Sequence, residues 1–285
     1  MPKTYNDLYI EARKLFRDKG IEAYNLEARL IVAHAAGKTM EKLMRDLRLY
    51  TAEETEAALA ELIMRRLNGE PAAYITGNWE FFGLPVEITR DVLIPRMDTE
   101  VLAETAIKII SEHKTDARVL DLCAGSGCIG AAIAKNLSGT RIVMVDISAA
   151  ALAVCRKNVA LNNLSPRVTC IEGDVRQSPP MLVGSFDVVV CNPPYIPTED
   201  IEKLDKSVKD YEPLWALDGG EDGLYYYRAA LKNWKTVLRD NGWIIFEVGV
   251  NQAEEVKKLL RINNFKGIGS AFDTLGIERV VYAKI

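Results

Sequence analysis

Short apolar segments alternate with amphipathic ones throughout the part of the chain that follows Arg118, and this alternation constrains the fold more than any other feature. Apolar strands separated by amphipathic helices are typical of a parallel sheet that is covered on both faces, so we expect an α/β fold. The expected strands are 119–123, 141–145, 168–172, 186–191, 243–248 and 280–283, and the expected helices are 129–137, 149–161, 224–238 and 253–262.

The region before this alternation has two parts. Residues 1–73 carry apolar side chains at helical spacing and predict a small bundle, with helix starts at Asn25, at Thr39 and at a capping box of Thr51 and Glu54. Residues 74–97 are rich in strand formers and predict a β-hairpin that joins the bundle to residues 98–285, with its turn at 83–85 and a helix at 98–110. The bundle shows no obvious chemistry, so a packing role and a partner-docking role are equally open.

Composition excludes several classes of protein. The 285 residues have a net charge of −4 and a pI of about 5.5. This acidic balance weighs against a protein that binds long nucleic acids. No apolar run approaches the roughly 18 residues that a membrane span needs, and the polar N-terminus lacks a signal-peptide core, so we expect a cytoplasmic protein. None of the five cysteines forms a Cys-x-x-Cys pair, and we expect no metal site and no disulfide framework.

A glycine-containing turn follows the first expected strand of the alternating region. Gly125 and Gly127 allow the backbone to approach a ligand closely, and Asp146, about 20 residues further on, is suited to accept hydrogen bonds from two ribose hydroxyls. Asp121 lies just before the turn, where it would repel a pyrophosphate but attract the sulfonium and ammonium of S-adenosylmethionine. Asp174 follows the third strand and could reach an adenine amino group. The alternatives are a purely structural Asp121 and a plain turn aspartate at Asp174.

A second motif, Asn192-Pro193-Pro194-Tyr195, follows the buried strand 186–191 directly. Ligands of open α/β sheets bind at this carboxyl edge, and two prolines make the loop stiff. The side-chain oxygen of Asn192 and the backbone oxygen of Pro193 could both accept hydrogen bonds from one NH₂ group, while Tyr195 packs on a planar group. The motif therefore predicts methyl transfer to an amide or an amino-aromatic nitrogen, achieved mainly by positioning.

The chain resembles the release factor glutamine methyltransferases, the protein-(glutamine-N5) methyltransferase family. The resemblance covers nearly the whole chain and includes, besides the two motifs above, the segments 74–77, 80–83, 93–100, 146–148, 211–213, 216–217, 219–220, 222–224 and 247–249 and Gln252. Asn-Pro-Pro-Tyr alone is shared with adenine-N6 DNA methyltransferases, whereas Ile-Pro-Arg-x-Asp-Thr-Glu and the helical N-terminal domain are more specific. Cys123 and Met97 depart from the family pattern, which more often has glycine and proline there.

The resemblance implies a class I Rossmann-like methyltransferase domain with a mostly parallel seven-stranded sheet, and S-adenosyl-L-methionine as the cofactor. It implies that the substrate is the glutamine of the Gly-Gly-Gln motif in bacterial-type peptide chain release factors, that the N-terminal bundle docks this substrate, and that no stable nucleic-acid or membrane binding occurs. A monomer is the default expectation. The candidate catalytic residues are Asn192, Pro193, Pro194 and Tyr195, and the candidate cofactor contacts are Asp121, Cys123, Ala124, Gly125, Ser126, Gly127, Asp146, Asp174, Val175 and Asn192.

Three further interpretations stay open at this point. The first is an adenine-N6 methyltransferase that acts on DNA or RNA, the second is a dinucleotide-dependent oxidoreductase, and the third is a cofactor-binding interaction module without activity. Arg96 and Thr99 match the family motif and could border the methionine end of the cofactor. Alternatively, Thr99 is an N-terminal helix cap.

Overall fold

The computed structural model describes residues 2–181 and 183–285, and the chain divides into two compact units. Unit 1 contains Met1–Asn78 together with Asp205–Tyr211, and unit 2 contains Trp79–Leu204 and Glu212–Ile285. The short segment Asp205–Tyr211 is separated from the rest of unit 1 by more than a hundred residues, and no local sequence pattern indicated this association.

Unit 1 is helical. Apolar residues spaced by three or four positions, such as Leu8, Ala12 and Phe16, form one buried core with side chains from the neighbouring helices. The helices are α1 (Tyr5–Asp18), α2 (Tyr24–Ala35), α3 (Met40–Asp46), α4 (Glu53–Leu67), α5 (Ala72–Thr76) and α9 (Lys206–Lys209).

Three helix starts in unit 1 were predicted from capping residues, and each can be compared with the structure. Thr39 caps α3 as predicted, because its hydroxyl accepts a hydrogen bond from the Lys42 backbone N–H. The other two predicted starts are wrong. Asn25 lies inside α2, and Ala52 rather than Thr51 precedes α4. The Thr51 hydroxyl instead lies 3.0 Å from both the backbone oxygen of Lys3 and the Glu56 carboxylate, which share its one hydrogen and which spacing alone did not reveal.

A two-stranded sheet of β1 (Asn78–Phe81) and β2 (Leu84–Glu87) forms the predicted hairpin. Its turn is one position earlier than expected, at Phe82 and Gly83, which both have positive φ angles of 51° and 73°. Two consecutive positive φ angles match the twist of a tight hairpin, so Leu84 and Pro85 belong to the second strand rather than to the turn.

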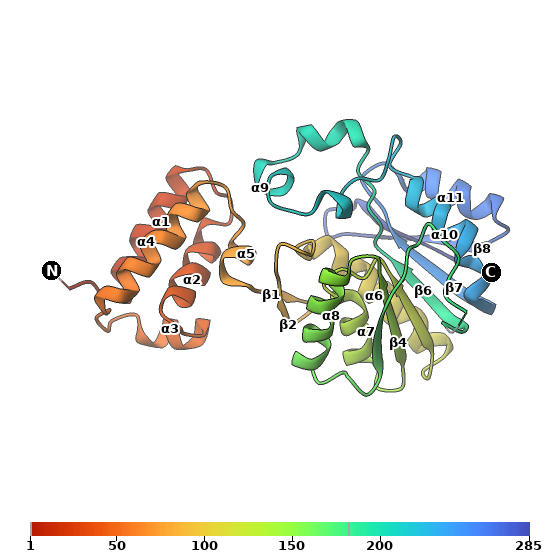
Figure 1. Ribbon diagram of the computed structural model, residues 1–285, viewed down its shortest axis with the longest axis horizontal. Helices are drawn as coiled ribbons and strands as arrows, with labels where there is room; N and C mark the ends of the chain where they lie inside the picture. The colour runs from red at the N-terminus through yellow and green to blue at the C-terminus, as the bar shows by residue number, and fades with distance from the viewer. Residues whose placement is uncertain (1, 182) are drawn as a thin grey trace. The chain divides into compact units, whose positions relative to one another are not determined.

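Unit 2 is built on a seven-stranded sheet with the order β5-β4-β3-β6-β7-β9-β8 (Figure 1). All neighbouring strands are parallel except those that pair with β9, which confirms the predicted Rossmann-like, mostly parallel sheet. The strands are β3 (Arg118–Leu122), β4 (Arg141–Asp146), β5 (Val168–Glu172), β6 (Phe186–Cys191), β7 (Leu238–Glu247), β8 (Lys266–Phe272) and β9 (Glu278–Lys284).

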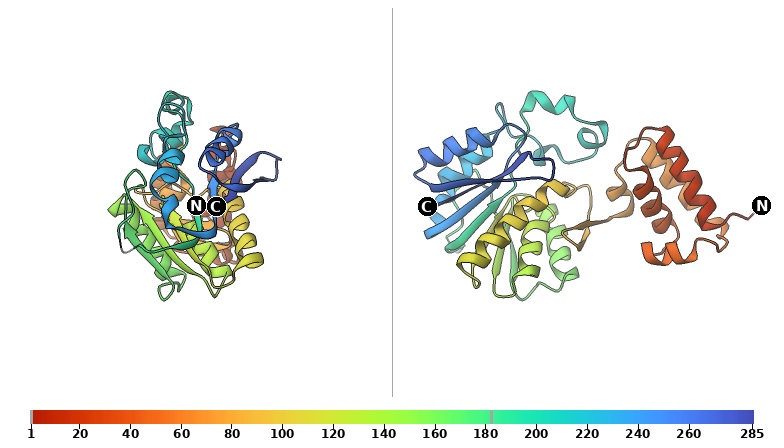
Figure 2. Two further views of the ribbon diagram at one scale, coloured as in Figure 1. Left: turned by 90° about the vertical axis from the view of Figure 1, so that its right-hand side faces the viewer. Right: turned by 180° about the vertical axis from the view of Figure 1, so that it is seen from behind.

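Helices cover both faces of this sheet (Figures 1 and 2). The helices α6 (Glu100–His113), α7 (Cys128–Asn136) and α8 (Ala149–Leu161) contact one another on one face, and α10 (Tyr225–Asn233) and α11 (Ala253–Ile262) contact each other on the opposite face. The remaining short elements are the 3₁₀ turns η1 (Met97–Thr99), η2 (Thr198–Lys203), η3 (Leu214–Ala216) and η4 (Lys235–Val237). In the two described stretches, no helix has the length and apolar character needed to cross a membrane.

The register of the parallel strands positions the two sequence motifs. Leu122, the last residue of β3, pairs with Val145 near the end of β4 on one side and with Cys191, the last residue of β6, on the other. The turn that follows β3 and the loop that follows β6 therefore leave the sheet side by side at its carboxyl edge.

Candidate active site

The turn between β3 and α7 requires unusual backbone conformations. Cys123, Gly125 and Gly127 have φ angles of 58°, 53° and 77°. Side chains with a Cβ rarely adopt the left-handed conformation of Cys123, which is the physical reason that glycine would suit this position. A Cβ at Gly127 would lie 2.6 Å from the Cys155 Sγ, whereas one at Gly125 would meet nothing within 4 Å. The backbone at Gly125 therefore borders open space.

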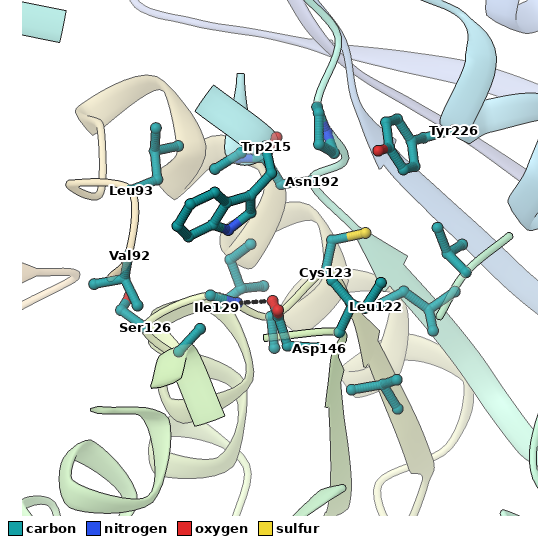
Figure 3. A pocket seen from close by; sticks show the side chains of 18 of the residues that line it. Val92, Leu93, Leu122, Cys123, Ser126, Ile129, Asp146, Asn192, Trp215 and Tyr226 are labelled. Atoms are coloured by element: carbon teal, nitrogen blue, oxygen red, sulfur yellow. Dashed lines mark hydrogen bonds between the residues drawn. The ribbon is translucent and has the colours of Figure 1, made fainter. Parts of the chain in front are cut away.

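A pocket opens at this turn, and Figure 3 shows it from close by. Two predicted cofactor residues, Asp121 and Gly127, lie behind its wall, and Pro193 and Tyr195 of the predicted catalytic motif are also outside its lining. The predicted site residues that line the pocket are Cys123, Ala124, Gly125, Ser126, Asp146, Asp174, Val175, Asn192 and Pro194.

Asp146 ends β4 and holds the turn in place. One carboxylate oxygen accepts a hydrogen bond from the Gly125 backbone N–H at 2.8 Å, the bond drawn in Figure 3, and the other accepts from the Ser148 N–H at 2.9 Å. Burial raises the pKa of this carboxyl, and the two backbone N–H groups oppose the shift. Each oxygen keeps a lone pair for a further donor, which fits a pair of ligand hydroxyls.

Asp121 is the last but one residue of β3 and faces α7. It is fully buried, its Oδ2 accepts a hydrogen bond from the Gly130 N–H at 2.9 Å, and its Oδ1 has no partner among the described residues. Burial raises the pKa of this carboxyl to about 7. An incompletely satisfied buried carboxylate behind the pocket is costly by itself and favours a cationic ligand nearby. The bond to Gly130 shows that Asp121 also anchors the first turn of α7.

Asp174 follows β5 and already has a partner. Its carboxylate accepts hydrogen bonds from the backbone N–H and the guanidinium of Arg176, both at 2.8 Å, and hydrogen bonding from Arg176 lowers its pKa. Asp174 can accept a further hydrogen bond from a ligand in the pocket, but the structure also supports the simple turn aspartate that the sequence left open.

The Asn-Pro-Pro-Tyr loop leaves the end of β6 beside the turn. Asn192 is half-buried, and its Nδ2 donates to the Thr99 hydroxyl at 3.5 Å. The Tyr195 hydroxyl donates to Glu247 Oε1 at 3.5 Å, while the Tyr195 backbone oxygen accepts from Gln252 Nε2 at 2.8 Å. Thr99 occupies the N-cap position of α6, the alternative that the sequence left open, but its side chain makes no capping hydrogen bond, and its hydroxyl accepts from Asn192 instead.

Of the two residues expected near the methionine end of the cofactor, Thr99 lines the pocket and Arg96 does not. The buried Glu212 carboxylate accepts hydrogen bonds from the Ile94 N–H and from Arg96, a contact that the sequence did not indicate. Trp215 and Tyr226 line the pocket, and the Trp215 ring points into it near Leu93 (Figure 3). The only sequence signal for Trp215 is a large aromatic residue in a proline-containing loop.

Among the residues that the structure describes, no three His, Cys, Asp or Glu side chains are arranged to hold a metal ion. The residues of the pocket that could hold a cofactor are the Asp146 carboxylate and the backbone turn at Gly125, with the buried Asp121 carboxyl close to this turn.

Comparisons with known proteins agree with this geometry. A family model for the methyltransferase small domain matches residues 98–206, and one for the PrmC N-terminal domain matches residues 7–77. A release factor glutamine methyltransferase from Clostridium botulinum is 36% identical and is aligned over 98% of both chains. The enzyme of that name from Geobacter sulfurreducens is 39% identical over 96% of this chain and 94% of its own.

Among solved structures, the hMettl16 catalytic domain in complex with MAT2A 3′UTR hairpin 6 matches 81% of each chain with a TM-score of 0.56. Its 18% identity supports the shared fold alone. The two full-length relatives carry more information, because their similarity extends over the helical N-terminal region as well as the methyltransferase domain. By this similarity over nearly its whole length, the chain belongs to the release factor glutamine methyltransferase family.

Proposed function

We propose that this enzyme transfers a methyl group from S-adenosyl-L-methionine to the side-chain amide nitrogen, N5, of the glutamine in the Gly-Gly-Gln motif of peptide chain release factors. The observation that carries this proposal is the position of Asn192 and Pro194 in the wall of the same pocket as Gly125 and Asp146. A carboxamide-binding loop and a nucleoside-binding turn share one cavity at the carboxyl edge of the sheet.

The pocket residues fit this cofactor. Asp146 would accept hydrogen bonds from the ribose hydroxyls, the Gly125 backbone would allow close approach, and Asp174 and Val175 would border the adenine. The unpartnered oxygen of Asp121 would supply negative charge behind the cationic end. When bound, the cofactor supplies an electrophilic methyl group on a sulfonium.

The Asn-Pro-Pro-Tyr loop would orient the substrate amide. The lone pair of an amide nitrogen is delocalised, so this nitrogen is a weak nucleophile unless it is held in a reactive geometry. Asn192 directs its Nδ2 toward Thr99, which leaves Oδ1 free to accept one substrate N–H, and the Pro193 carbonyl would accept the other. In well-oriented systems, positioning of this kind supplies on the order of 7–11 kcal/mol, and a strong general base is not needed.

The remaining parts of the proposal concern the protein partner. We propose that residues 1–73 dock the release factor, because the PrmC N-terminal domain matches this region, and that the enzyme acts as a monomer in the cytoplasm, where its substrate functions. Unit 1 has its own core, which suits an independent docking domain.

The test is mass spectrometry of a purified release factor incubated with the enzyme and methyl-labelled cofactor. We expect one methyl group on the Gly-Gly-Gln glutamine and none on a release factor in which this glutamine is replaced by alanine. Methylation of adenine in DNA or RNA, with an unmodified release factor, would refute the proposal and support the adenine-N6 alternative.

A further inference from the structure

The two prolines of the Asn-Pro-Pro-Tyr loop cannot fix its position through their own backbone donors. Pro193 and Pro194 are buried, and because proline has no backbone N–H, neither can donate a hydrogen bond to its surroundings. The proposed function also needs the Pro193 carbonyl to stay open to the substrate. The loop must therefore be held at its two ends, and its first end follows Cys191, which pairs with Leu122 in the sheet.

Gln252 holds the second end of the loop. Its Nε2 donates to the Tyr195 backbone oxygen at 2.8 Å, and its Oε1 accepts from the Gly249 N–H at 3.0 Å. Gln252 directly precedes α11, but its side chain makes no capping hydrogen bond to that helix. The carboxamide instead links the turn that follows β7 to the end of the loop, and we call these two hydrogen bonds the Gln252 bridge.

The polarity of the backbone fixes the orientation of this carboxamide. A backbone N–H can only donate and a backbone oxygen can only accept, so Oε1 must face Gly249 and Nε2 must face Tyr195. In the opposite orientation, two oxygens would meet at Tyr195 and two N–H groups would meet at Gly249. A side chain of the same shape that lacks the NH₂ group therefore cannot replace glutamine in the bridge.

The peptide group that joins Tyr195 to Ile196 is held from both sides. Its oxygen accepts from Gln252, and its N–H donates to the Leu217 backbone oxygen at 3.0 Å. Without the Gln252 bridge only the second of these two bonds would remain, and the peptide group would be free to tilt about it. A tilt there would be transmitted to the Pro193 carbonyl, because the two prolines fix the φ angles between them.

Two glycines leave just enough room for the Gln252 bridge. A Cβ at Gly223 would lie 2.5 Å from Gln252 Nε2 and 2.4 Å from the Tyr195 oxygen, and a Cβ at Gly249 would lie 2.8 Å from Gln252 Oε1. These separations are shorter than any van der Waals contact, so a larger residue at either position would displace the amide. The bridge is thus enclosed closely as well as hydrogen bonded.

We propose that Gln252 is a positioning residue that holds the Tyr195 backbone and thereby keeps the Pro193 carbonyl and the Asn192 side chain aimed at the substrate amide. The inference rests on the proposed function, because it assigns Gln252 a part in that reaction. Gln252 does not line the pocket, so it acts through the loop rather than on the substrate or the cofactor.

The experiment measures kcat and KM for a release factor with methyl-labelled cofactor, and the Kd of S-adenosylmethionine by titration calorimetry. Gln252→Glu keeps the shape of the side chain and an acceptor for Gly249, but it places a carboxylate oxygen against the Tyr195 oxygen. We expect kcat to fall about 10- to 100-fold, the cost of a displacement of the order of 1 Å at the reacting groups. KM and Kd should stay within about threefold of the wild type.

Gln252→Met is a second variant that keeps the test decisive if Gln252→Glu does not fold. Methionine has a similar length and no charge, and it removes both hydrogen bonds of the bridge. Its kcat should fall by at least about tenfold, again with KM and Kd near those of the wild type.

Tyr227→Phe is the matched control. It removes another 2.8 Å hydrogen bond from a side chain to a backbone oxygen, that of Glu247, which lies outside the loop. We expect this variant to lose stability in urea unfolding and to keep a kcat near that of the wild type. If Gln252 were merely structural, its variants would behave in the same way as Tyr227→Phe.

The outcomes separate this inference from the function on which it rests. A wild-type enzyme that leaves every release factor unmodified would refute the proposed function. An active wild type of which either folded Gln252 variant keeps full kcat would overturn the positioning role. A rise in KM or Kd as large as the loss of kcat, or an equal loss of kcat in Tyr227→Phe, would overturn it as well.

Discussion

At the scale of single residues, Asn192 is the side chain on which turnover should depend most. We expect Asn192→Ala to lower kcat by about 10²–10³, the usual cost of removing one positioned hydrogen-bond partner from a reacting group. Binding of S-adenosylmethionine should change little, because in the proposed site the turn, Asp146 and Asp174 would provide most of the polar contacts to it. Isothermal titration and single-turnover methylation measure the two quantities separately.

Two results of this experiment would contradict the role assigned to Asn192. An Asn192→Ala enzyme with wild-type kcat would show that the side-chain oxygen does not orient the amide. A variant that loses cofactor affinity to the same extent as turnover would assign Asn192 to the cofactor rather than to the substrate.

Asp121 gives a second residue-scale prediction, which concerns charge. Because its pKa is raised to about 7, it is largely neutral at pH 6 and ionised at pH 8. We expect wild-type affinity for S-adenosylmethionine to increase as the pH rises through this range, and Asp121→Asn to bind about tenfold more weakly at pH 8, which corresponds to ~1.4 kcal/mol.

S-adenosylhomocysteine is the matched ligand for this test, because it lacks the sulfonium charge. Titration calorimetry at pH 8 should show a smaller loss of affinity for it in Asp121→Asn. Equal losses for both ligands would leave Asp121 with its anchoring bond to Gly130 as its main role.

At the scale of elements, the rim of the pocket depends on one tertiary hydrogen-bonding group. The Glu212 carboxylate accepts from the buried Ile94 N–H at 3.2 Å and pairs with Arg96. Glu212→Ala should lower the free energy of unfolding by about 2 kcal/mol, chiefly because the Ile94 N–H loses its acceptor. The Arg96 side chain is 40% exposed, so the charge pair itself should add little.

Lys258→Ala is the control for this prediction. It removes an ion pair with Glu255 whose side chains are about half exposed, and its effect should stay within about 1 kcal/mol. Urea unfolding compares the two variants directly. Equal stability losses would show that the Ile94 contact contributes nothing beyond surface charge.

Comparison of predicted and observed helix and strand boundaries shows which elements the local sequence is sufficient to predict. The expected boundaries of β5, β6, α8 and α11 match the structure, because each is a single apolar or amphipathic run between clear breakers. The strand β8 was not predicted, since its glycines and small residues carry little strand signal. The helix expected at 224–238 ends at Asn233, because the chain turns through η4 and starts β7 at Leu238.

The features of the candidate site can likewise be separated into those that the sequence predicted and those that it did not. The pocket residues on the two loops that follow β3 and β6 were predictable, because each motif is continuous in sequence and the sheet edge is set by topology. The contacts of Glu212 and Glu247 join segments more than fifty residues apart, and the left-handed conformation of Cys123 depends on the turn as a whole. Such features arise from tertiary structure, which local periodicity does not encode.

At the scale of the whole molecule, the two units can be followed separately. All four tryptophans, Trp79, Trp215, Trp234 and Trp243, lie in unit 2, so tryptophan fluorescence reports on the unfolding of the methyltransferase unit alone. A circular dichroism signal, by contrast, includes the helices of unit 1. Different midpoints for the two signals would show that the units unfold independently.

Three carboxyls with raised pKa values should give unit 2 an unusual dependence of stability on pH. Burial raises the pKa values of Asp121 and Glu247 to about 7 and also raises that of Asp146. A carboxyl whose pKa is higher in the folded state favours folding while it is protonated, and this contribution is lost as the pH rises through the folded pKa. The stability of unit 2 should therefore fall between pH 5 and pH 8, by at most roughly 3 kcal/mol for each strongly shifted group.

Asp222 is a carboxyl of unit 2 that acts outside this range. Hydrogen bonding from Arg228 lowers the pKa of Asp222 to about 2, so its contribution is lost only in strong acid.

Glu247→Gln removes one of the carboxyls whose pKa is raised. This variant should be more stable than the wild type at pH 8 and should lose less stability from pH 5 to pH 8. Urea unfolding monitored by tryptophan fluorescence at both pH values measures this difference for unit 2. A wild type that gains stability between pH 5 and pH 8 would contradict the prediction, because buried carboxyls with raised pKa values can only lose folding free energy as they ionise.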